Sequence, residues 1–394
     1  MTTSAAQIRA YAGPPLFSYG FRPFFLFGAL WAAIAVALWL PILSGHLSLP
    51  STLAPIEWHT HELIFGYVPA IVTGFLLTAV PNWTGRLPIV GARLALLFFV
   101  WSAGRMAIFF SQFLGAWPAA AIDMAFLVAV GAVIAREIIA SGNTSNLKVL
   151  IGVTLILIGN GWFHLEANEG LGNGHGTRLG IGATVLLIML IGGRIIPSFT
   201  RNWLARRERG RLPAPFDRFD AVVMIVSGIA LAVWVGAPHA TATAILALAA
   251  GLMNGARLAR WSGERTVAEP LVLILHVAYA FVPVGFFLLA LGIVRPDVVA
   301  PSGALHGWTV GAIGTMTLAV MTRASLGHTG RPLTATRQIQ FIYLAAMISA
   351  LARISAAFDL LREPMLHLSA AAWVAAFGGF VIIYAPLLTR KTRP

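Results

Sequence analysis

The chain has 394 residues, of which 58% are hydrophobic and only 10% are charged, and its mean hydropathy is +0.82. Soluble domains carry about 25% charged residues, so this composition excludes a soluble globular protein and places the chain in a lipid bilayer. Cysteine is absent, which excludes disulfides, thiolate nucleophiles and cysteine-ligated metals. The formal net charge of +13 needs a separate explanation, because it could indicate a nucleic-acid partner.

Apolar runs of about 18 residues or more recur along the chain, and each is long enough to cross a bilayer. We therefore predict an all-α polytopic membrane protein with about twelve transmembrane helices. One transmembrane domain is expected over residues 1–394, with no separate soluble domain. No signal-peptide pattern precedes the first run, so it is expected to be a retained helix. The predicted spans are 24–41, 61–80, 93–114, 117–140, 147–165, 178–200, 218–236, 240–260, 270–292, 304–326, 338–357 and 366–389.

Most lysines and arginines fall in alternate connections between these spans, as the positive-inside rule requires. These connections and both chain termini are therefore predicted to be cytoplasmic. The opposite loops hold Arg178, Arg295 and Arg362. The basic run RNWLARRERGR, which begins at Arg201, is predicted to be a solvated loop near anionic lipid headgroups. No nucleic-acid partner is expected.

Histidines are the candidate metal ligands. His59 and His61 open the second predicted span, His164 ends the fifth and His306 begins the tenth, all toward the predicted outer face. Four imidazoles from three spans at one height, in a chain without cysteine, indicate a haem or copper site. On a continuous helix the first two would point about 200° apart. Both can therefore face one site only if His59 lies in an extended segment; otherwise they serve neighbouring sites.

Two further histidines lie elsewhere in the predicted topology. His328 is 22 residues after His306 on the same span, or about 33 Å along a helix, so the two cannot bind one metal ion. His276 lies within the ninth span, where an ionisable residue indicates function. A neutral imidazole bonded to a neighbouring helix is its alternative. Polar groups at a wet boundary are the simplest interpretation of His46, His175, His239 and His367.

Two glutamates follow the predicted ligands closely. Glu62 comes three residues after His59, and Glu166 comes two residues after His164. Each could accept the second ring N–H of a ligating histidine. Both are also candidates, with Glu57, for delivering protons from the outer side.

Charged residues within spans complete the candidate set. Arg105 is expected to pair with Asp123 on the next helix, and recognition of a haem propionate is the alternative for this arginine. Arg194 also lies within a span, where Pro197 is expected to break the helix. The glycines at 192 and 193 would allow close approach of another helix. Snorkelling to the inner face is the alternative for Arg194.

A short internal match links the second and tenth spans. His61, Gly66 and the TGR that ends at Arg86 recur at a constant offset of 245 residues, as His306, Gly311 and the TGR that ends at Arg331. The match is consistent with repeated four-helix units.

The chain resembles the NnrS family of bacterial membrane proteins. The matching stretches are YGFRPFFLFGAL, WHTHELIFGYVPAIVTGFLLTAVPNWTGR, WFHLEA, GGRIIPSFTRN and LHGWTVGAIGTMTLAVMTRASLGHTGRPL. This resemblance implies a twelve-span protein of the bacterial inner membrane that contains haem and copper and belongs to the nitric oxide response. The family's histidines would fall on His59, His61, His164, His276, His306 and His328.

The pattern of six histidines in twelve spans is also similar to that of haem–copper oxidases and their nitric oxide reductase relatives. Those proteins contain three arcs of four helices. This chain has no histidine within the sixth or seventh predicted span, where that superfamily holds its non-haem metal. Fold analogy alone does not establish function.

The leading hypothesis is reduction of nitric oxide to nitrous oxide as a defence against nitrosative stress. One or two haem b groups, or a haem and a copper, would act near the outer face, with electrons from a quinol or a small cytochrome. A second hypothesis is a non-catalytic haem protein that senses nitric oxide or protects metal pools. A third hypothesis is a secondary transporter, with which Arg194 and the helix-breaking prolines and glycines are compatible. Whether the protein forms a homodimer is left open.

Overall fold

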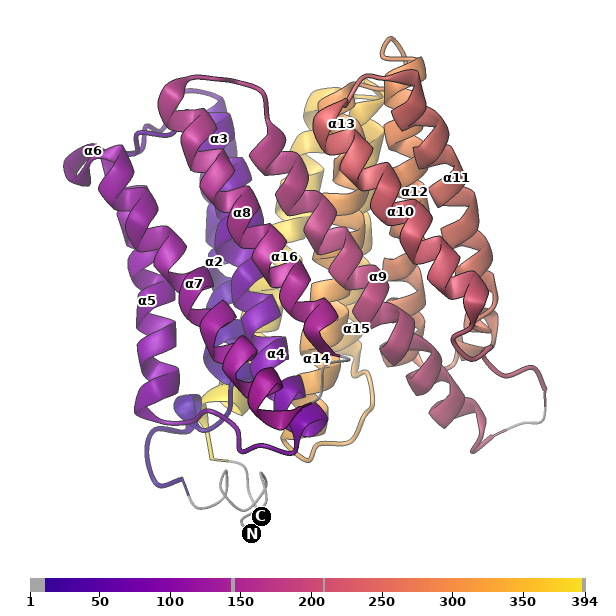
Figure 1. Cartoon of the computed structure of the whole chain (residues 1–394). Helices are drawn as coiled ribbons and strands as arrows, with labels where there is room; N and C mark the ends of the chain where they lie inside the picture. Colours follow the sequence, from indigo (N-terminus) through magenta and orange to yellow (C-terminus); the bar gives the residue numbers. More distant parts are fainter. Residues whose placement is uncertain (1–10, 143–145, 208–209, 392–394) are drawn as a thin grey trace. The chain divides into compact units, whose positions relative to one another are not determined.

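The computed structural model describes residues 11–142, 146–207 and 210–391, which form helices and connecting turns without a strand. Twelve helical segments among these residues are long and apolar enough to cross a membrane, which confirms the predicted all-α polytopic fold (Figure 1). They are α2 (Phe21–Leu43), α3 to α4 (Pro55–Thr84), α5 (Ala92–Phe109), α7 (Ala116–Ser141), α8 (Leu147–Glu169), α9 (His175–Leu204), α10 (Arg218–Gly236), α11 (Thr241–Ala259), α12 (Pro270–Val294), α13 to α14 (Pro301–His328), α15 (Arg337–Ala357) and α16 (Arg362–Thr389).

Contacts between Cα atoms divide the chain into two compact units. Unit 1 contains the residues up to Gly180, the short segment His328–Gly330 and the residues from Phe377 onward. Unit 2 contains Ile181–Gly327 and Arg331–Ala376.

Within unit 1, α7 lies between α5 and α8, and α2 packs against α4 (Figure 1). A glycine allows the last of these contacts. A Cβ atom on Gly74 of α4 would lie 2.8 Å from a ring carbon of Phe25 and 3.1 Å from Cβ of Phe24. Both phenylalanines are fully buried, so the missing side chain at Gly74 lets two aromatic residues of α2 pack against α4.

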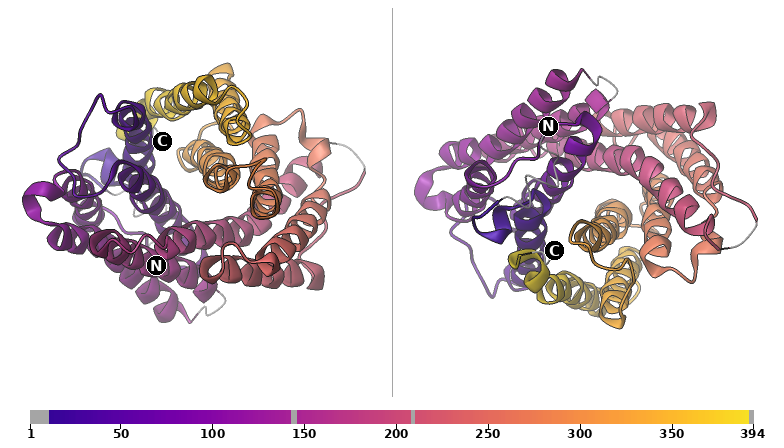
Figure 2. Two further views of the ribbon diagram at one scale, coloured as in Figure 1. Left: turned by 90° about the horizontal axis from the view of Figure 1, so that it is seen from above. Right: turned by 90° about the horizontal axis from the view of Figure 1, so that it is seen from below.

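Within unit 2, the helix that continues from α13 into α14 lies between α12 and α15 (Figure 2). Trp308 of this helix is completely buried, and its indole N–H donates to the carbonyl of Val282 on α12 at 3.0 Å. A Cβ atom on Gly285 would overlap the indole ring. The ring therefore occupies the surface that this glycine leaves open.

A buried arginine connects four helices of unit 2. Arg257 of α11 donates to Asp220 of α10 at 2.8 Å, to the hydroxyl of Tyr279 on α12 at 3.0 Å and to the carbonyl of Met189 on α9 at 3.1 Å. A Cβ atom on Gly193 would overlap the guanidinium. The space at Gly193 is therefore filled by an arginine side chain, and the predicted close approach of another helix stays a prediction.

Each of two membrane helices contains a π-helical segment. The first, η2 (Glu62–Tyr67), begins directly after His61, and the second, η5 (Gly307–Gly314), begins directly after His306. Their starting residues differ by 245, the offset of the sequence match. Single π-helical turns are rare and occur often at functional sites. The repeated four-helix unit stays a prediction.

One helix end and one predicted helix break differ clearly from the prediction. The third span ends at Phe109, and residues Ser111–Leu114 form a separate short helix, α6, rather than the end of a helix over 93–114. The predicted break at Pro197 is wrong, because α9 continues from His175 to Leu204. Proline is tolerated inside membrane helices because neighbouring groups can satisfy the backbone groups that it frees.

Candidate metal centre

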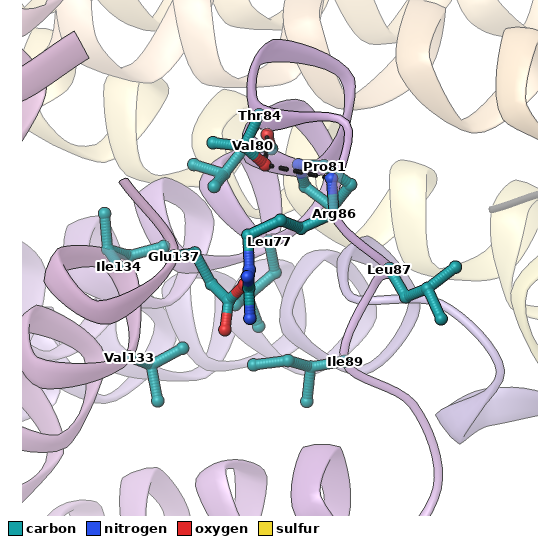
Figure 3. A pocket seen from close by; sticks show the side chains of 10 residues that line it. All are labelled: Leu77, Val80, Pro81, Thr84, Arg86, Leu87, Ile89, Val133, Ile134 and Glu137. Atoms are coloured by element: carbon teal, nitrogen blue, oxygen red, sulfur yellow. Dashed lines mark hydrogen bonds and ion pairs between the residues drawn. The ribbon is translucent and has the colours of Figure 1, made fainter. Parts of the chain in front are cut away.

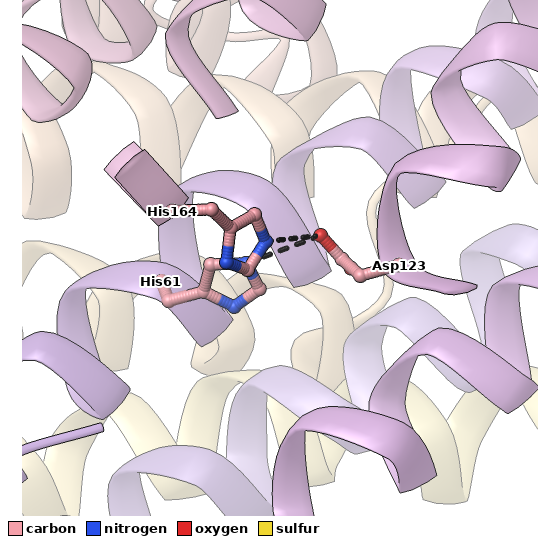
Figure 4. Close-up of side chains that lie close together, drawn as sticks. All are labelled: His61, Asp123 and His164. Carbon is pink, nitrogen blue, oxygen red and sulfur yellow. Dashed lines mark hydrogen bonds and ion pairs between the residues drawn. The ribbon is translucent and has the colours of Figure 1, made fainter. Parts of the chain in front are cut away.

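Three buried side chains from three helical segments of unit 1 lie close together (Figure 4). His61 ends α3, Asp123 lies on α7 and His164 lies on α8. The Nε2 atoms of His61 and His164 lie 3.2 and 3.1 Å from Oδ2 of Asp123. Ligand atoms at about 2.0–2.2 Å from one metal ion are themselves about 3 Å apart. The arrangement therefore fits a single small ion.

Local sequence places each of these side chains. Pro55 occupies the first turn of α3, where a missing N–H does no harm, and Glu57 accepts the backbone N–H of Ala54 at 2.9 Å. This capped turn fixes the start of the helix that ends at His61. On α8, Asn160 and His164 are four residues apart and so share one face.

A carboxylate orients the first histidine. Nδ1 of His61 lies 2.9 Å from Oε1 of Glu62. The other oxygen of Glu62 accepts from Nε1 of Trp31 at 2.6 Å and from Nη1 of Arg105 at 3.2 Å. Metal-binding histidines usually donate their second ring N–H to a carboxylate or carbonyl in this way. Glu62 therefore accepts the second ring nitrogen of a candidate ligand, as predicted, and this histidine is its neighbour His61.

Asp123 is also held on both oxygens. Its Oδ1 forms an ion pair with Nη2 of Arg105, so the predicted pair between these residues is confirmed. Its Oδ2, which faces both histidines, accepts from Nδ2 of Asn160 at 2.7 Å. Arg105 therefore bridges the carboxylates of Asp123 and Glu62, and the positions of both acidic groups are fixed.

The charges of the cluster favour a bound cation. One guanidinium, that of Arg105, faces two carboxylates, Glu62 and Asp123, and all three side chains are at most 3% exposed. An uncompensated charge inside a membrane helix bundle is costly. A proton on an imidazole or a metal cation balances the second carboxylate. Either cation would therefore balance the charge of the buried group.

A glycine brings the arginine to the cluster. A Cβ atom on Gly66, within η2, would overlap Nη1 of Arg105 and would lie 2.9 Å from Oε2 of Glu62. The carbonyl of Gly66 accepts from Nε1 of Trp101 on α5 at 2.9 Å. The π-helical segment thus presents a bare backbone surface to the guanidinium.

The other predicted residues of unit 1 have different partners. The ring of His59 stacks on Trp39, with centroids 4.3 Å apart and planes inclined by 16°. The carboxylate of Glu166 lies 2.9 Å from Nδ1 of His175 and accepts the backbone N–H groups of His175 and Gly176. Glu166 therefore stabilises the first turn of α9, and its predicted pairing with His164 is wrong.

The remaining predicted ligands also have specific neighbours. Nδ1 of His328 lies 3.5 Å from the hydroxyl of Tyr19 in unit 1. In unit 2, Nδ1 of His306 lies 3.0 Å from the carbonyl of Ser302. Arg194 lies exposed on α9. Among the described residues, the six predicted histidine ligands thus contribute His61 and His164 to a group with metal-ligand spacing.

Both ring nitrogens of His276, in unit 2, lie close against neighbouring residues. Its Nε2 lies 2.8 Å from Oγ1 of Thr200. A Cβ atom on Gly263 would lie 2.6 Å from its Nδ1, and this nitrogen has no hydrogen-bond partner among the described residues. The contact with Thr200 matches the alternative expectation of an imidazole bonded to a neighbouring helix.

Two residues of the site were not predicted as metal-site residues: the candidate ligand Asp123 and its hydrogen-bond partner Asn160. Asp123 was expected only as the partner of Arg105, and Asn160 was not singled out. The sequence does contain an indication of each residue. Asn160 lies four residues, or about one helical turn, before His164, and Asp123 is a carboxylate within an apolar span.

The cluster fits an ion but does not fit a haem. A porphyrin iron needs an imidazole nitrogen with an open face, whereas Nε2 of both His61 and His164 lies against Asp123. His276 is likewise enclosed by Thr200 and Gly263. His61, His164 and His276 are therefore not placed to ligate a haem iron.

A small pocket lies elsewhere in unit 1, between the end of α4 and α7 (Figure 3). An ion pair between Arg86 and Glu137 forms part of its lining. Glu137 lies fourteen residues after Asp123 on α7, or about 21 Å along the helix. This pocket is therefore separate from the metal-ligand cluster.

Comparison with known proteins identifies a family. The model of the NnrS family, described as NnrS protein, matches residues 15–392, which is nearly the whole chain. None of the curated proteins or solved structures that were compared matches it.

Proposed function

The chain belongs to the NnrS family, and from this premise we propose that it binds nitric oxide in the membrane and reduces it to nitrous oxide. The reaction would serve as a defence against nitrosative stress in the bacterial inner membrane. The observation that carries the proposal is the buried group of His61, Asp123 and His164 within membrane-spanning helices. Such a group can hold a metal ion where a small apolar gas dissolves.

The proposed reaction joins two nitric oxide molecules. Two molecules of nitric oxide, two electrons and two protons give one nitrous oxide and one water. A nitrogen–nitrogen bond forms, one nitrogen–oxygen bond breaks, and the released oxygen leaves as water. We propose a quinol or a small cytochrome as the electron donor. His61, Asp123 and His164 would hold a redox-active metal ion, and that ion would supply a binding position for nitric oxide and a route for electrons.

Side chains of the chain would supply orientation and protons. Glu62 holds the ring of His61 at 2.9 Å, and Arg105 holds both carboxylates. We propose that Glu62 and Glu166 deliver the two protons. Haem b, if the protein also carries it, would be bound through His59, His306 or His328, which lie outside the cluster.

Complete burial of the cluster supports a second candidate function, binding of nitric oxide without turnover. His61 is 0% exposed and His164 is 2% exposed. A site closed to water suits an apolar gas but slows the proton supply that reduction requires. The protein would then sense nitric oxide or protect metal pools.

The test is a nitric oxide consumption assay on the purified, reduced protein, with nitrous oxide measured by gas chromatography. We expect nitric oxide loss and nitrous oxide formation in a 2:1 ratio. The variant H164N should abolish both, whereas H46Q, which changes an imidazole that contacts Ser44 in an exposed loop, should abolish neither. Nitric oxide binding without any nitrous oxide would reject reduction and favour the second candidate.

A further inference from the structure

We propose that the group of His61, Asp123 and His164 is a mononuclear non-haem iron site that binds ferrous iron directly, without a porphyrin. This inference rests on the proposed function for the choice of a redox-active ion. The choice of a bare ion rests on the cluster itself, because both Nε2 atoms converge on one carboxylate oxygen at 3.1–3.2 Å.

The donor set favours iron. Two imidazole nitrogens and one carboxylate oxygen form the set that non-haem ferrous enzymes use, and it leaves positions open for a small ligand. Reduced copper is favoured by soft sulfur ligands, whereas this donor set contains a hard carboxylate oxygen and no sulfur. Zinc accepts the same donors, but it is redox-inert and could not support the proposed reaction.

The residues around the three candidate ligands hold these ligands in place. Glu62 holds the far nitrogen of His61, Arg105 holds the far oxygen of Asp123, and Asn160 donates to the near oxygen of Asp123. The atom of His61 and the atom of Asp123 that face away from the proposed ion are thus each held by a charged side chain. Outer residues of this kind orient the ligands of metal sites and tune the ion that they bind.

An unsatisfied amide oxygen points to a further ligand. Asn160 is 0% exposed, and among the residues that the structure describes its Oδ1 has no hydrogen-bond partner, although its Nδ2 contacts Asp123 at 2.7 Å. Buried acceptors are rarely left without a donor. A water bound to the ion would supply that donor. The orphan oxygen is therefore an observation independent of the three ligands.

The test is anaerobic titration of the metal-free, detergent-solubilised full chain with ferrous ion, followed by elemental analysis and electron paramagnetic resonance after addition of nitric oxide. We expect one iron per chain and the spectrum of a high-spin ferrous–nitrosyl centre without porphyrin. Binding of less than stoichiometric iron, or a spectrum of a haem nitrosyl only, would overturn the inference.

Variants distinguish ligands from structural residues. H164N removes one ligand but keeps the ion pair of Arg105 with Asp123, so the fold should survive, and iron and the nitrosyl spectrum should be lost. D123N tests the carboxylate ligand directly. E62Q and N160L should weaken iron binding about 10–100-fold, as outer residues of metal sites do. H46Q should bind iron like the wild type. Wild-type iron affinity in H164N and D123N would contradict the assignment.

The two proposals can fail separately. One iron per chain with a ferrous–nitrosyl spectrum but no nitrous oxide would reject catalysis and keep the iron site. Nitrous oxide formation by protein that binds no iron in the cluster would reject the iron site and keep catalysis.

Discussion

Arg105 on α5 and Asp123 on α7 form an ion pair between neighbouring helices, and their side chains are only 3% and 1% exposed. The same guanidinium also donates to Glu62 at 3.2 Å. Removal of one partner from a buried ion pair leaves the other charge without compensation. The pair therefore links the stability of unit 1 to the integrity of the metal-ligand cluster.

Replacement of Arg105 by methionine should destabilise the protein by about 3–5 kcal/mol, because two buried carboxylates would lose their shared cation. The measurement is thermal or denaturant unfolding of the detergent-solubilised protein. Arg136→Met is the matched control, since the Arg136 side chain on α7 is 69% exposed. Equal stability of the two variants would show that the buried pair contributes nothing.

Replacement of Gly66 by alanine should displace the guanidinium of Arg105, because the new methyl group would occupy its position and would crowd Glu62 at 2.9 Å. Metal affinity should fall about 10–100-fold, because Arg105 and Glu62 would no longer hold the candidate ligands in position. Gly131→Ala on α7 is the control, since a Cβ atom there meets nothing within 4 Å. The measurement is the iron affinity of both variants, determined by titration with ferrous ion. Unchanged affinity in the Gly66 variant would contradict the proposed role of the guanidinium.

Replacement of Tyr279 by phenylalanine should destabilise unit 2 by about 1–3 kcal/mol, because two buried polar groups lose a partner. The hydroxyl of Tyr279 accepts from Arg257 at 3.0 Å and donates to Asn254 at 2.8 Å. Unfolding curves provide the measurement. Tyr11→Phe changes a tyrosine outside the membrane helices and should have little effect. A variant as stable as the wild type would show that the network has other sources of stability.

Acidification should weaken an ion pair at the start of α10. The hydrogen bond from Arg260 lowers the pKa of Asp217 to about 2. Because the unfolded value is about 3.9, the stabilisation is complete above that pH and is lost as the pH falls toward 2. Asparagine at 217 keeps the helix cap but removes the charge. The difference in melting temperature between wild type and D217N should therefore shrink on acidification through this range. A constant difference would contradict the pKa shift.

The sequence by itself determined the membrane helices, because the free energy of placing apolar segments in lipid depends mainly on local composition and length. The predicted span 218–236 and the helix Arg218–Gly236 have the same bounds. The pairing of Arg105 with Asp123 also followed from the sequence, since charges at similar depth on consecutive helices must be neutralised.

Only the tertiary structure decided which polar groups meet. Depth along a helix can be counted from the sequence at about 1.5 Å per residue, but the rotation and neighbours of each helix depend on packing over its whole surface. His59 and His61 have similar depth, yet one stacks on Trp39 and the other enters the cluster. Asp123 joins His61 and His164 because three helical segments bring these residues together, and no local pattern specifies that contact.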